Sequence, residues 1–412
     1  MSGGAARIAW ARARMPVLAA VASPGGSAAP GADGDGLSTL ADRRIAISLP
    51  LDPTTAVLAL TLRDAGAQVA VHAPAAETDD AVADALAHAG IAVFARSDAT
   101  APAAAVALLD GLLDTRPDLL VDDGAHALRR VHDVRRDVLA TLRGGSEQTT
   151  SGVRPLRELA AAGELAIPVL AVDDARTKRI ADNGHGTGQS CVAAVLDVSG
   201  ILLGGKAVAV AGYGPVGRGV ARHAAALGAR VTVSEIDPHR ALEALLDGHA
   251  VAPLARAAQT ADLLFSATGI ARTVRLDVLR ALPDGALVAV AGGVAGEVDV
   301  GALRAAAGGS PQPLARDLDA YRLDGRRLLL VAGGECVNVA AAEGNPIEAM
   351  DCSLALQALA LAHLAGDGAG LAPGLHPLPA ELDARVARLR LAAAGAELEP
   401  RSATERMARD WR

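Results

Sequence analysis

The chain has 412 residues, more than one ordinary domain needs, so roughly two to three domains are expected. Hydrophobic residues make up 51% of the sequence and aromatic residues only 1%, so its cores must be built from Ala, Val and Leu. The net charge of -8, without basic blocks or aromatic residues between basic ones, offers a nucleic acid nothing to bind. A small-molecule substrate is therefore expected.

Cysteine usage and hydropathy exclude further classes. Cys191, Cys336 and Cys352 are unclustered in the sequence and lack metal-ligand spacing, so we expect neither a disulfide framework nor a metal site. No uninterrupted apolar run reaches membrane-spanning length, and the N-terminus lacks the order of a signal peptide. We expect a soluble, cytoplasmic protein without a membrane partner.

The first half of the chain alternates strands and helices. A helical pattern from Ile8 to Leu18 is followed by a loop rich in Gly, Ala, Pro and Ser from Ser23 to Gly36. Strands are predicted at Arg44–Leu49, Gln68–His72, Ile91–Phe94, Leu119–Val121 and Val169–Val172. Helices are predicted at Thr54–Ala65, Asp79–Ala89, Pro102–Leu113, Ala125–Ala140 and Leu156–Ala162. The alternation indicates a parallel sheet covered on both faces.

Three polar turns follow predicted strands: Asp122–Gly124, Ser146–Gly152 and Asp173–Asn183. Each alone fits a capped turn or a solvated face as well as it fits a site. Ligands of parallel α/β sheets bind at the carboxyl ends of the strands. Since all three turns fall there, together they favour a ligand cleft.

The stretch from Lys206 to Asp237 has the pattern of a dinucleotide-binding unit. An apolar strand, Ala207–Ala211, precedes a G-x-G-x-x-G turn, a helix and a second strand that ends at Glu235. In such a unit the glycines let the chain turn tightly and approach the pyrophosphate, and the acid binds the ribose hydroxyls of NAD. The charge of Glu235 would repel the extra phosphate of NADP. The expected cofactor contacts here are Gly212, Gly214, Pro215, Val216, Gly217, Glu235 and Ile236.

The rest of the chain completes this domain and adds a C-terminal segment. The predicted elements are a strand at Leu263–Ser266, a turn at Ala267–Gly269, a helix at Leu276–Ala281, a strand at Ala286–Ala291, a hairpin of Arg326–Val331 with Glu335–Val339, and helices at Ser353–Ala365 and Ala380–Ala394.

Several ordered motifs, VDDGAHAL, GGSEQTTSGV, VDDARTKRIADN, AVAVAGYGPVGRG, YRLDGRRLLLVAGGECVN and GNPIEAM, give the chain a resemblance to the S-adenosylhomocysteine hydrolases. The resemblance runs from about Ile8 to Trp411. It implies an α/β fold with two doubly wound parallel-sheet domains joined by hinges. Residues 1–183 with 347–374 would form the substrate domain, 184–346 the NAD domain, and 375–412 a C-terminal segment for oligomer contacts. It also implies a homo-oligomer, a dimer or tetramer, and NAD held as a recycling oxidant.

The resemblance assigns roles to individual residues. Lys178 and Asp182 would hold the ribose hydroxyls of a nucleoside, and Lys178 would also serve proton transfer at the 3′ oxygen; a surface salt bridge is the alternative. Asn183 and Asp123 match residues of the family's cleft. The further NAD contacts implied are Thr149, Thr150, Ser151 and Asn338.

The sequence departs from the family where the base and the leaving group are handled. Family acid/base histidines are replaced by Pro50, Gly293 and Asn345, a catalytic Glu by Gln148, a cleft Cys by Thr187, and base-contacting residues by Asp52 and Thr54. Asp52 either accepts a purine amino group or caps the helix at Thr54. His185 is a candidate replacement acid/base, or it caps the following helix. Gln148 and Asn345 join Asp52 and Thr54 as expected substrate contacts.

These departures favour a changed reaction. The leading hypothesis is 3′ oxidation of an adenosine-like nucleoside, loss of the C4′ hydrogen and loss of a 5′ hydroxyl, which gives a 4′,5′-unsaturated nucleoside. Epimerisation would use the same intermediate. The alternatives are an ordinary S-adenosylhomocysteine hydrolase and a catalytically silent NAD-binding regulatory paralog.

Overall fold

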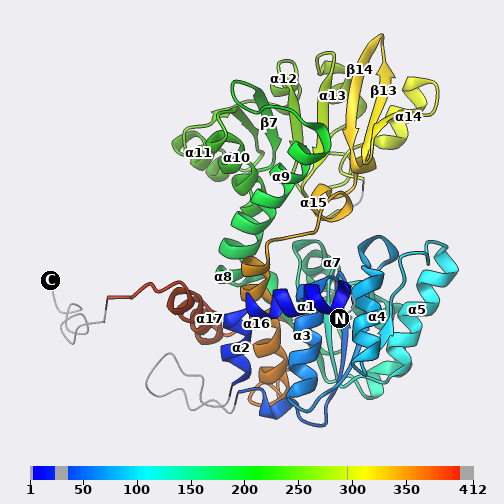
Figure 1. Ribbon diagram of the computed structural model, residues 1–412, viewed down its shortest axis with the longest axis vertical. Coiled ribbons are helices and arrows are strands. Elements are labelled where there is room, and N and C mark those ends of the chain that lie inside the picture. Colours follow the sequence, from blue (N-terminus) through cyan, green and yellow to red (C-terminus); the bar gives the residue numbers. More distant parts are fainter. Residues whose placement is uncertain (1–2, 24–35, 295, 400–412) are drawn as a thin grey trace.

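The computed structural model describes residues 3–23, 36–294 and 296–399. It has two α/β domains, one above the other in Figure 1, connected by the helical stretch that begins at α8 (Arg176–Lys178) and by the segment between α15 (Val337–Ala340) and α16 (Ile347–Ala365). The predicted loop from Ser23 to Gly36 lies almost wholly outside the described residues.

The first domain is built on a seven-stranded parallel sheet with the strand order β15-β6-β5-β4-β1-β2-β3. Its strands are β1 (Arg44–Ser48), β2 (Gln68–His72), β3 (Ala92–Phe94), β4 (Leu119–Asp122), β5 (Gly144–Glu147), β6 (Pro168–Ala171) and β15 (Gly374–Pro377). Its α-helices are α1 (Gly3–Ala13), α2 (Pro16–Ala22), α3 (Pro53–Asp64), α4 (Asp80–His88), α5 (Pro102–Asp114), α6 (His126–Asp133), α7 (Thr150–Ala161), α16 (Ile347–Ala365) and α17 (Ala380–Ala393). Short 3-10 turns η1 (Ser38–Leu40), η2 (Ala75–Glu77), η3 (Arg136–Ala140) and η4 (Val172–Asp174) complete it.

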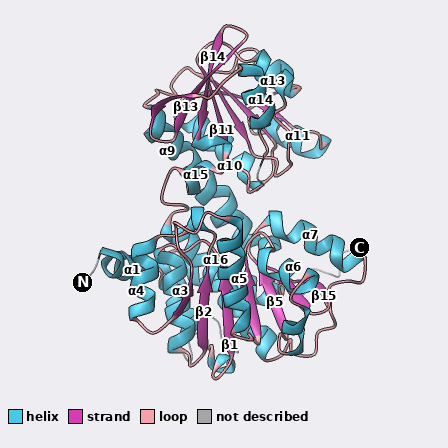
Figure 2. Ribbon diagram, turned by 90° about the vertical axis from the view of Figure 1, so that its right-hand side faces the viewer, coloured by secondary structure: helices cyan, strands magenta, loops and turns pink. Residues whose placement is uncertain are grey.

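The second domain carries an eight-stranded sheet with the order β12-β13-β14-β11-β10-β7-β8-β9. Its strands are β7 (Ala207–Ala211), β8 (Arg230–Ser234), β9 (Ala250–Val251), β10 (Leu263–Ser266), β11 (Ala286–Val290), β12 (Gln312–Ala315), β13 (Leu318–Leu323) and β14 (Arg326–Val331). Its helices are α10 (Pro215–Ala226), α11 (Pro238–Leu246), α12 (Leu254–Ala258), α13 (Leu276–Ala281), α14 (Val300–Ala307), η6 (Ala332–Gly334) and α15 (Val337–Ala340). Helices cover both faces of both sheets (Figure 2), which confirms the predicted doubly wound α/β class.

Two elements of the second domain differ from the prediction. The late hairpin pairs Arg326–Val331 with β13 in antiparallel register, not with Glu335–Val339. The latter residues leave the sheet through η6 and the short helix α15. The turn Asp324–Gly325 has positive φ at both residues, which suits the tight connection of a hairpin, so the turn lies before β14 and not after it.

The connection between the domains also differs from the prediction. The predicted polar turn at Asp173–Asn183 is largely helical, with α8 (Arg176–Lys178), the π-helix η5 (Arg179–Thr187) and α9 (Gly188–Ser199) in succession. Asp, Asn and Gly disfavour a helix interior, so the sequence resembled a turn. Single π-helical stretches occur mostly at functional sites, and this one carries the candidate catalytic residues.

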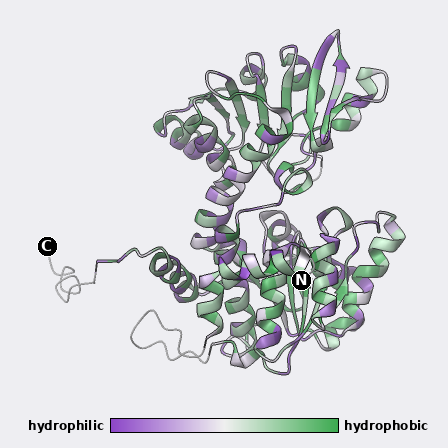
Figure 3. Ribbon diagram, viewed as in Figure 1, coloured by the Kyte–Doolittle hydropathy of each residue, from purple (hydrophilic) through white to green (hydrophobic). Residues whose placement is uncertain are grey.

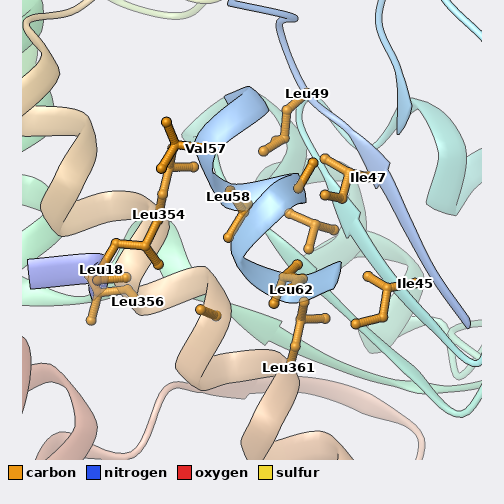
Figure 4. Packing of buried hydrophobic residues seen from close by; sticks show 14 of the residues in the cluster. Leu18, Ile45, Ile47, Leu49, Val57, Leu58, Leu62, Leu354, Leu356 and Leu361 are labelled. Atoms are coloured by element: carbon orange, nitrogen blue, oxygen red, sulfur yellow. The ribbon is translucent and has the colours of Figure 1, made fainter. Parts of the chain in front are cut away.

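The first domain's core lies between β1, α3 and α16. Leu58 and Leu62 of α3 point toward Ile45 and Ile47 of β1, with Leu361 of α16 beside them (Figure 4). All these side chains are buried, and most strands of both sheets are coloured toward the hydrophobic end in Figure 3, whereas the outer hairpin β13–β14 also has hydrophilic stretches. The core thus orients the carboxyl ends of the strands toward the second domain.

Helix α16 is long and apolar enough to cross a membrane by length and composition. It lies in this core, however, with 67% of its apolar window buried, as expected for a core helix. The segment after it also packs on the first domain: β15 pairs with β6, and α17 contacts α2 and α16. The expected domain boundaries and the role of residues 375–412 in oligomer contacts stay predictions.

Candidate functional site

A buried lysine forms the centre of the candidate site. The Lys178 Nζ lies 3.2 Å from Asp173 Oδ1 and 3.3 Å from Asp182 Oδ2, and it donates to Asn183 Oδ1. The Lys178 side chain is 4% exposed, so this is not a surface salt bridge. Burial alone would lower the pKa of Lys178, but Asp182 and Asp173 outweigh it and raise the pKa above its usual value. Lys178 is therefore an ammonium at neutral pH.

Two sets of hydrogen bonds hold this lysine in place. Asp383 on α17 accepts hydrogen bonds from the backbone N–H groups of Arg176 (2.8 Å) and Thr177 (3.0 Å), which begin α8. The Asn183 side chain on η5 donates to Asp173 Oδ1 at 3.1 Å, in the turn η4 that precedes α8. The C-terminal helix and the end of β6 thus hold the ammonium in place together.

Asp182 is held by a set of neutral donors. Ser353 Oγ donates to Asp182 Oδ2 at 2.7 Å and Gln148 Nε2 at 3.2 Å, while Asn345 Nδ2 donates to Oδ1. Gln357 Nε2 in turn donates to Gln148 Oε1 at 2.8 Å. Ser353 and Gln357 were missed at the sequence level. The signal was two polar residues four apart in the mainly apolar part of the helix from Ser353 to Ala362.

Hydroxyl groups connect this cluster to Asp123. Thr150 Oγ1 donates to Asp173 Oδ2 at 2.6 Å, Thr149 Oγ1 donates to Asp123 Oδ1 at 3.2 Å, and Ser151 Oγ donates to Thr149 Oγ1 at 3.0 Å. Burial raises the pKa of Asp123 to about 6, against the opposing charge of Lys178. The three predicted polar turns therefore meet in one network at the carboxyl edge of the sheet.

Asn345 and Asn338 link the network to the second domain. Asn338 Nδ2 donates to Asn345 Oδ1 at 2.9 Å, and Asn345 Nδ2 donates to Thr187 Oγ1 at 3.0 Å. Gly293 faces the same region, since a Cβ there would stand 3.6 Å from Ser151 Oγ. Two positions where the resemblance implies histidines thus lie near the network. Asn345 places an amide there, and Gly293 only a hydrogen atom.

Three predicted site residues lie outside this network. His185 is exposed, and its Nε2 lies 3.2 Å from Arg222 Nη1 on α10, away from Lys178. Asp52 Oδ1 accepts from the N–H groups of Thr54 and Thr55, both at 2.8 Å, and from Thr54 Oγ1 at 2.7 Å. Asp52 therefore caps helix α3, which is one of its two predicted roles. His185 pairs with Arg222 and with no residue named in the Lys178 network.

Further polar groups lie along the same edge of the first sheet. Ser48 ends β1 and His72 ends β2, and Ser48 Oγ lies 3.2 Å from His72 Nδ1. Burial, with the nearby His126, lowers the pKa of His72 to about 4, so the ring is neutral at pH 7. Burial, with Asp123 and Glu335, raises the pKa of Glu77 to about 7. The sequence reasoning missed these groups, although each ends or follows a predicted strand.

The glycine turn of the second domain fits a dinucleotide. Gly212 has φ +93°, and a Cβ on Gly217 would stand 2.1 Å from the carbonyl oxygen of Gly212, so the turn needs glycine at both positions. Pro215 and Val216 begin α10, and no side chain caps its N-terminus. Pro215 has no N–H group, so Val216 and Gly217 supply the first N–H groups that can bind phosphate. A Cβ on Gly214 would instead stand in open space, with Arg240 Nη1 at 3.8 Å as the nearest protein atom, so the turn has room for the pyrophosphate of NAD.

The acid expected to bind the cofactor ribose lies at this turn. Glu235 Oε2 accepts from the backbone N–H of Tyr213 at 2.8 Å, which places the carboxylate against the glycine turn. The side chain of Ile236, next in sequence, is 94% exposed. The strand order changes direction between β7 and β10, where such folds bind their ligands.

The three cysteines are far apart in the sequence, but Cys191 and Cys336 interact in the structure. Burial, with the neighbouring Cys336, raises the pKa of the Cys191 thiol well above its usual value. Cys336 Sγ donates to Asn338 Oδ1 at 3.0 Å and so holds the Asn338 side chain.

Comparisons with known families agree with this geometry. The model of the S-adenosyl-L-homocysteine hydrolase family matches residues 3–140, and that of its NAD binding domain matches residues 183–344. Adenosylhomocysteinase of Aeropyrum pernix is 42% identical over 399 residues, 96% of this chain and 93% of the relative. S-inosyl-L-homocysteine hydrolase of Methanopyrus kandleri is 40% identical over 394 residues, 95% and 91% of the two chains.

Two further comparisons cover most of the chain. Adenosylhomocysteinase of Thermotoga maritima is 37% identical over 414 residues, 100% of both chains. Among solved structures, a dipicolinate synthase chain from Bacillus halodurans superposes with a TM-score of 0.50 at 15% identity, over 79% of this chain and 99% of that one. At that identity the likeness shows only the arrangement of the two domains.

Proposed function

Because this chain belongs to the S-adenosylhomocysteine hydrolase family and contains its NAD binding domain, we propose that it transiently oxidises the 3′ carbon of a purine nucleoside. The observation that carries this proposal is the buried Lys178 ammonium between Asp173 and Asp182, at the sheet edge that faces the cofactor domain. Bound NAD supplies the acceptor for a hydride. Every other step falls to side chains of the chain itself.

Lys178 and Asp182 bind the ribose hydroxyls in this proposal. The Lys178 ammonium contacts the 3′ oxygen, and the buried carboxylate of Asp182 accepts from the neighbouring hydroxyl. As the hydride leaves C3′, the proton of the 3′ hydroxyl moves to Lys178 and a proton of Lys178 moves to Asp182, so the pair gains one proton. Asp182 already accepts three neutral hydrogen bonds, from Ser353, Gln148 and Asn345, so it is oriented before substrate binds. Asn183 and Asp173 keep Lys178 from turning away.

Asp123 is the proposed base for the next step. A ketone at C3′ makes the C4′ hydrogen far more acidic, so a carboxylate suffices to remove it. With a pKa of about 6, Asp123 is mostly ionised at neutral pH but binds a proton more readily than an ordinary Asp. Thr149 orients it through a 3.2 Å hydrogen bond.

The proposed net reaction is loss of water from the nucleoside. The C4′ hydrogen leaves as a proton, the 5′ hydroxyl leaves with it, and return of the hydride to C3′ gives a 4′,5′-unsaturated nucleoside. Epimerisation follows from the same ketone if the proton returns to the other face. This reaction is supported by three replaced positions. The resemblance implies acid/base groups that handle the 5′ leaving group there, and this chain has Pro50, Gln148 and Gly293 instead.

A second candidate reaction is hydrolysis of a nucleoside thioether. It is supported by relatives that are 37 to 42% identical and are named for adenosylhomocysteine or S-inosyl-L-homocysteine. Since those names differ in the base, both adenine and hypoxanthine nucleosides belong in the assay. A silent NAD-binding paralog is the third candidate, and the complete Lys178 cluster disfavours it.

Mixing the NAD-loaded protein with nucleosides separates the three candidates. We expect the NADH absorbance to rise with adenosine or inosine, and mass spectrometry to detect a product lighter by one water. Release of homocysteine from S-adenosylhomocysteine or its inosyl analogue, without a dehydrated product, would favour hydrolysis. Absence of NADH with every nucleoside and thioether would contradict the proposal and leave the silent paralog.

Replacing Asp123 with asparagine should separate oxidation from proton removal. We expect Asp123→Asn to form NADH with substrate but to exchange the C4′ hydrogen with deuterated water about 10²- to 10⁴-fold more slowly. In the unchanged protein, exchange should decline as the pH falls through about 6, because Asp123 is then protonated. Asp133→Asn, at an exposed acid on α6, is the control. Normal exchange in Asp123→Asn would exclude it as the base.

A further inference from the structure

An arginine-lined pocket lies beside the glycine turn, outside the Lys178 cluster. It has a volume of 390 Å³ and lies between η5, α10 and α11. Its walls include Gly214 and Pro215 of the turn and the side chains of Arg222 and Arg240. We call it the arginine pocket.

The arginine pocket has more positive than negative charge. Four arginines line it, Arg179, Arg218, Arg222 and Arg240, against one carboxylate, Glu243. Two of the four are paired: Arg218 with Glu243, and Arg179 with Asp174.

The other two arginines of the pocket form no ion pair in the described part of the chain. Arg222 lies against the ring of His185, whose pKa is lowered by burial and by Arg222, so the ring brings no negative charge. The Arg240 guanidinium forms no hydrogen bond within the same residues, and it interacts electrostatically with Asp237, whose pKa it helps to lower. Asp237 caps α11, where it accepts from the backbone N–H groups of His239 and Arg240. Two guanidinium groups without a paired carboxylate thus face the cavity, which favours an anionic ligand.

The position of Arg240 indicates which kind of anion the pocket would bind. The atom nearest to the place where a Cβ on Gly214 would stand is Arg240 Nη1, at 3.8 Å. In a dinucleotide-binding turn this second glycine is where the backbone approaches the pyrophosphate. The 12-residue helix α10 begins at the next residue and directs its N–H groups to the same place. The guanidinium of Arg240 therefore lies where a diphosphate would be bound.

We propose that Arg240, with Arg222 as a weaker second group, binds the diphosphate of the dinucleotide, so that the arginine pocket is the phosphate-binding flank of the cofactor site. The chain then neutralises the cofactor's phosphate charge with its own arginines, in addition to the glycine turn and the helix N-terminus. A planar guanidinium can donate two parallel hydrogen bonds to phosphate oxygens. This assignment depends on the cofactor domain and is independent of which nucleoside is the substrate.

Calorimetry on the protein stripped of NAD tests the assignment. Arg240→Ala should weaken the binding of NAD and of ADP-ribose about 10- to 100-fold, as expected for loss of a charged hydrogen bond. It should also reduce the dependence of the NAD affinity on salt, because one phosphate contact is lost. Adenosine, which has no phosphate, should bind with unchanged affinity. Arg222→Ala should show a smaller change, and Arg240→Lys should restore part of the affinity.

The matched control is Arg256→Ala, which removes an exposed arginine of α12 in the same domain and should leave the NAD affinity unchanged. An unchanged NAD affinity and salt dependence in Arg240→Ala would overturn the assignment. It would also be overturned if inorganic pyrophosphate bound the NAD-loaded protein and only that binding required Arg240, since the pocket would then serve a separate anion. Circular dichroism of the variants checks that they remain folded.

Discussion

Replacing Lys178 with alanine is expected to slow 3′ oxidation by about three orders of magnitude, while NAD stays bound. In the described part of the chain the ammonium is the only cation paired with the carboxylates of Asp173 and Asp182, and both carboxylates are buried. Without it, the 3′ oxygen loses its donor and two negative charges remain unpaired. Stopped-flow absorbance of NADH after mixing with nucleoside measures the rate.

The amino-acid composition also distinguishes Lys178 from the other basic residues. Of the 39 basic residues, only Lys178 and Lys206 are lysines, so the chain uses arginine almost everywhere else. Lysine can give up a proton in a buried site and arginine cannot, which suits proton transfer at the 3′ oxygen. Lys206, partly exposed and 3.0 Å from Asp262, provides the matched control Lys206→Ala, which should oxidise substrate normally.

A second variant distinguishes a loss of proton transfer from a loss of folding. Removing one partner of a buried ion pair costs about 3–5 kcal/mol of unfolding free energy, so Lys178→Ala alone could fail for structural reasons. Lys178→Arg keeps the charge, and we expect it to stay folded and hold NAD yet form almost no NADH. Oxidation at a normal rate in folded Lys178→Arg would show that no proton passes through this residue.

Much of the fold was predictable from local patterns. The strands Gln68–His72, Ala207–Ala211 and Leu263–Ser266 agree with the structure at both ends, because each is an apolar run bounded by turn residues. Strand β5, by contrast, consists of Gly144, Gly145, Ser146 and Glu147, none of them favoured in strands. Its position depends on close packing: a Cβ on Gly145 would stand 3.1 Å from the carbonyl oxygen of Leu120 on the neighbouring strand. Tertiary contacts of this kind leave no local signal.

The candidate site residues that were predicted lie mostly in single segments: Lys178, Asp182 and Asn183 follow β6, and the predicted cofactor contacts follow β7. The structure brings the first three together in one network, and their roles stay predictions. Ser353, in contrast, lies 171 residues from Asp182, to which it donates. His185 was expected at the cleft because it is two residues from Asn183, but the π-helix turns it toward Arg222. The direction of a side chain on an irregular helix does not follow from spacing alone.

Two alanine substitutions in the glycine turn should both weaken NAD binding but differ in their effect on the stability of the NAD-free protein. A Cβ at Gly217 would stand 2.1 Å from the carbonyl oxygen of Gly212, so Gly217→Ala must deform the turn even without cofactor. We expect it to lower the stability of the NAD-free protein by about 1–3 kcal/mol and to abolish measurable NAD binding. Denaturant unfolding and calorimetry on the same preparation measure the two quantities.

Gly214 is the matched position in the same turn. Its φ of -70° suits alanine, and a Cβ there would meet no protein atom closer than Arg240 Nη1 at 3.8 Å. Gly214→Ala should therefore leave the stability of the NAD-free protein unchanged but weaken NAD about 10- to 100-fold, because the methyl group would occupy the approach of the pyrophosphate. If Gly214→Ala bound NAD normally, the pyrophosphate would not approach this glycine, and the placement of the cofactor beside Arg240 would be wrong as well. If instead both variants lost stability equally, the turn would be a structural element whose glycines do not serve the cofactor.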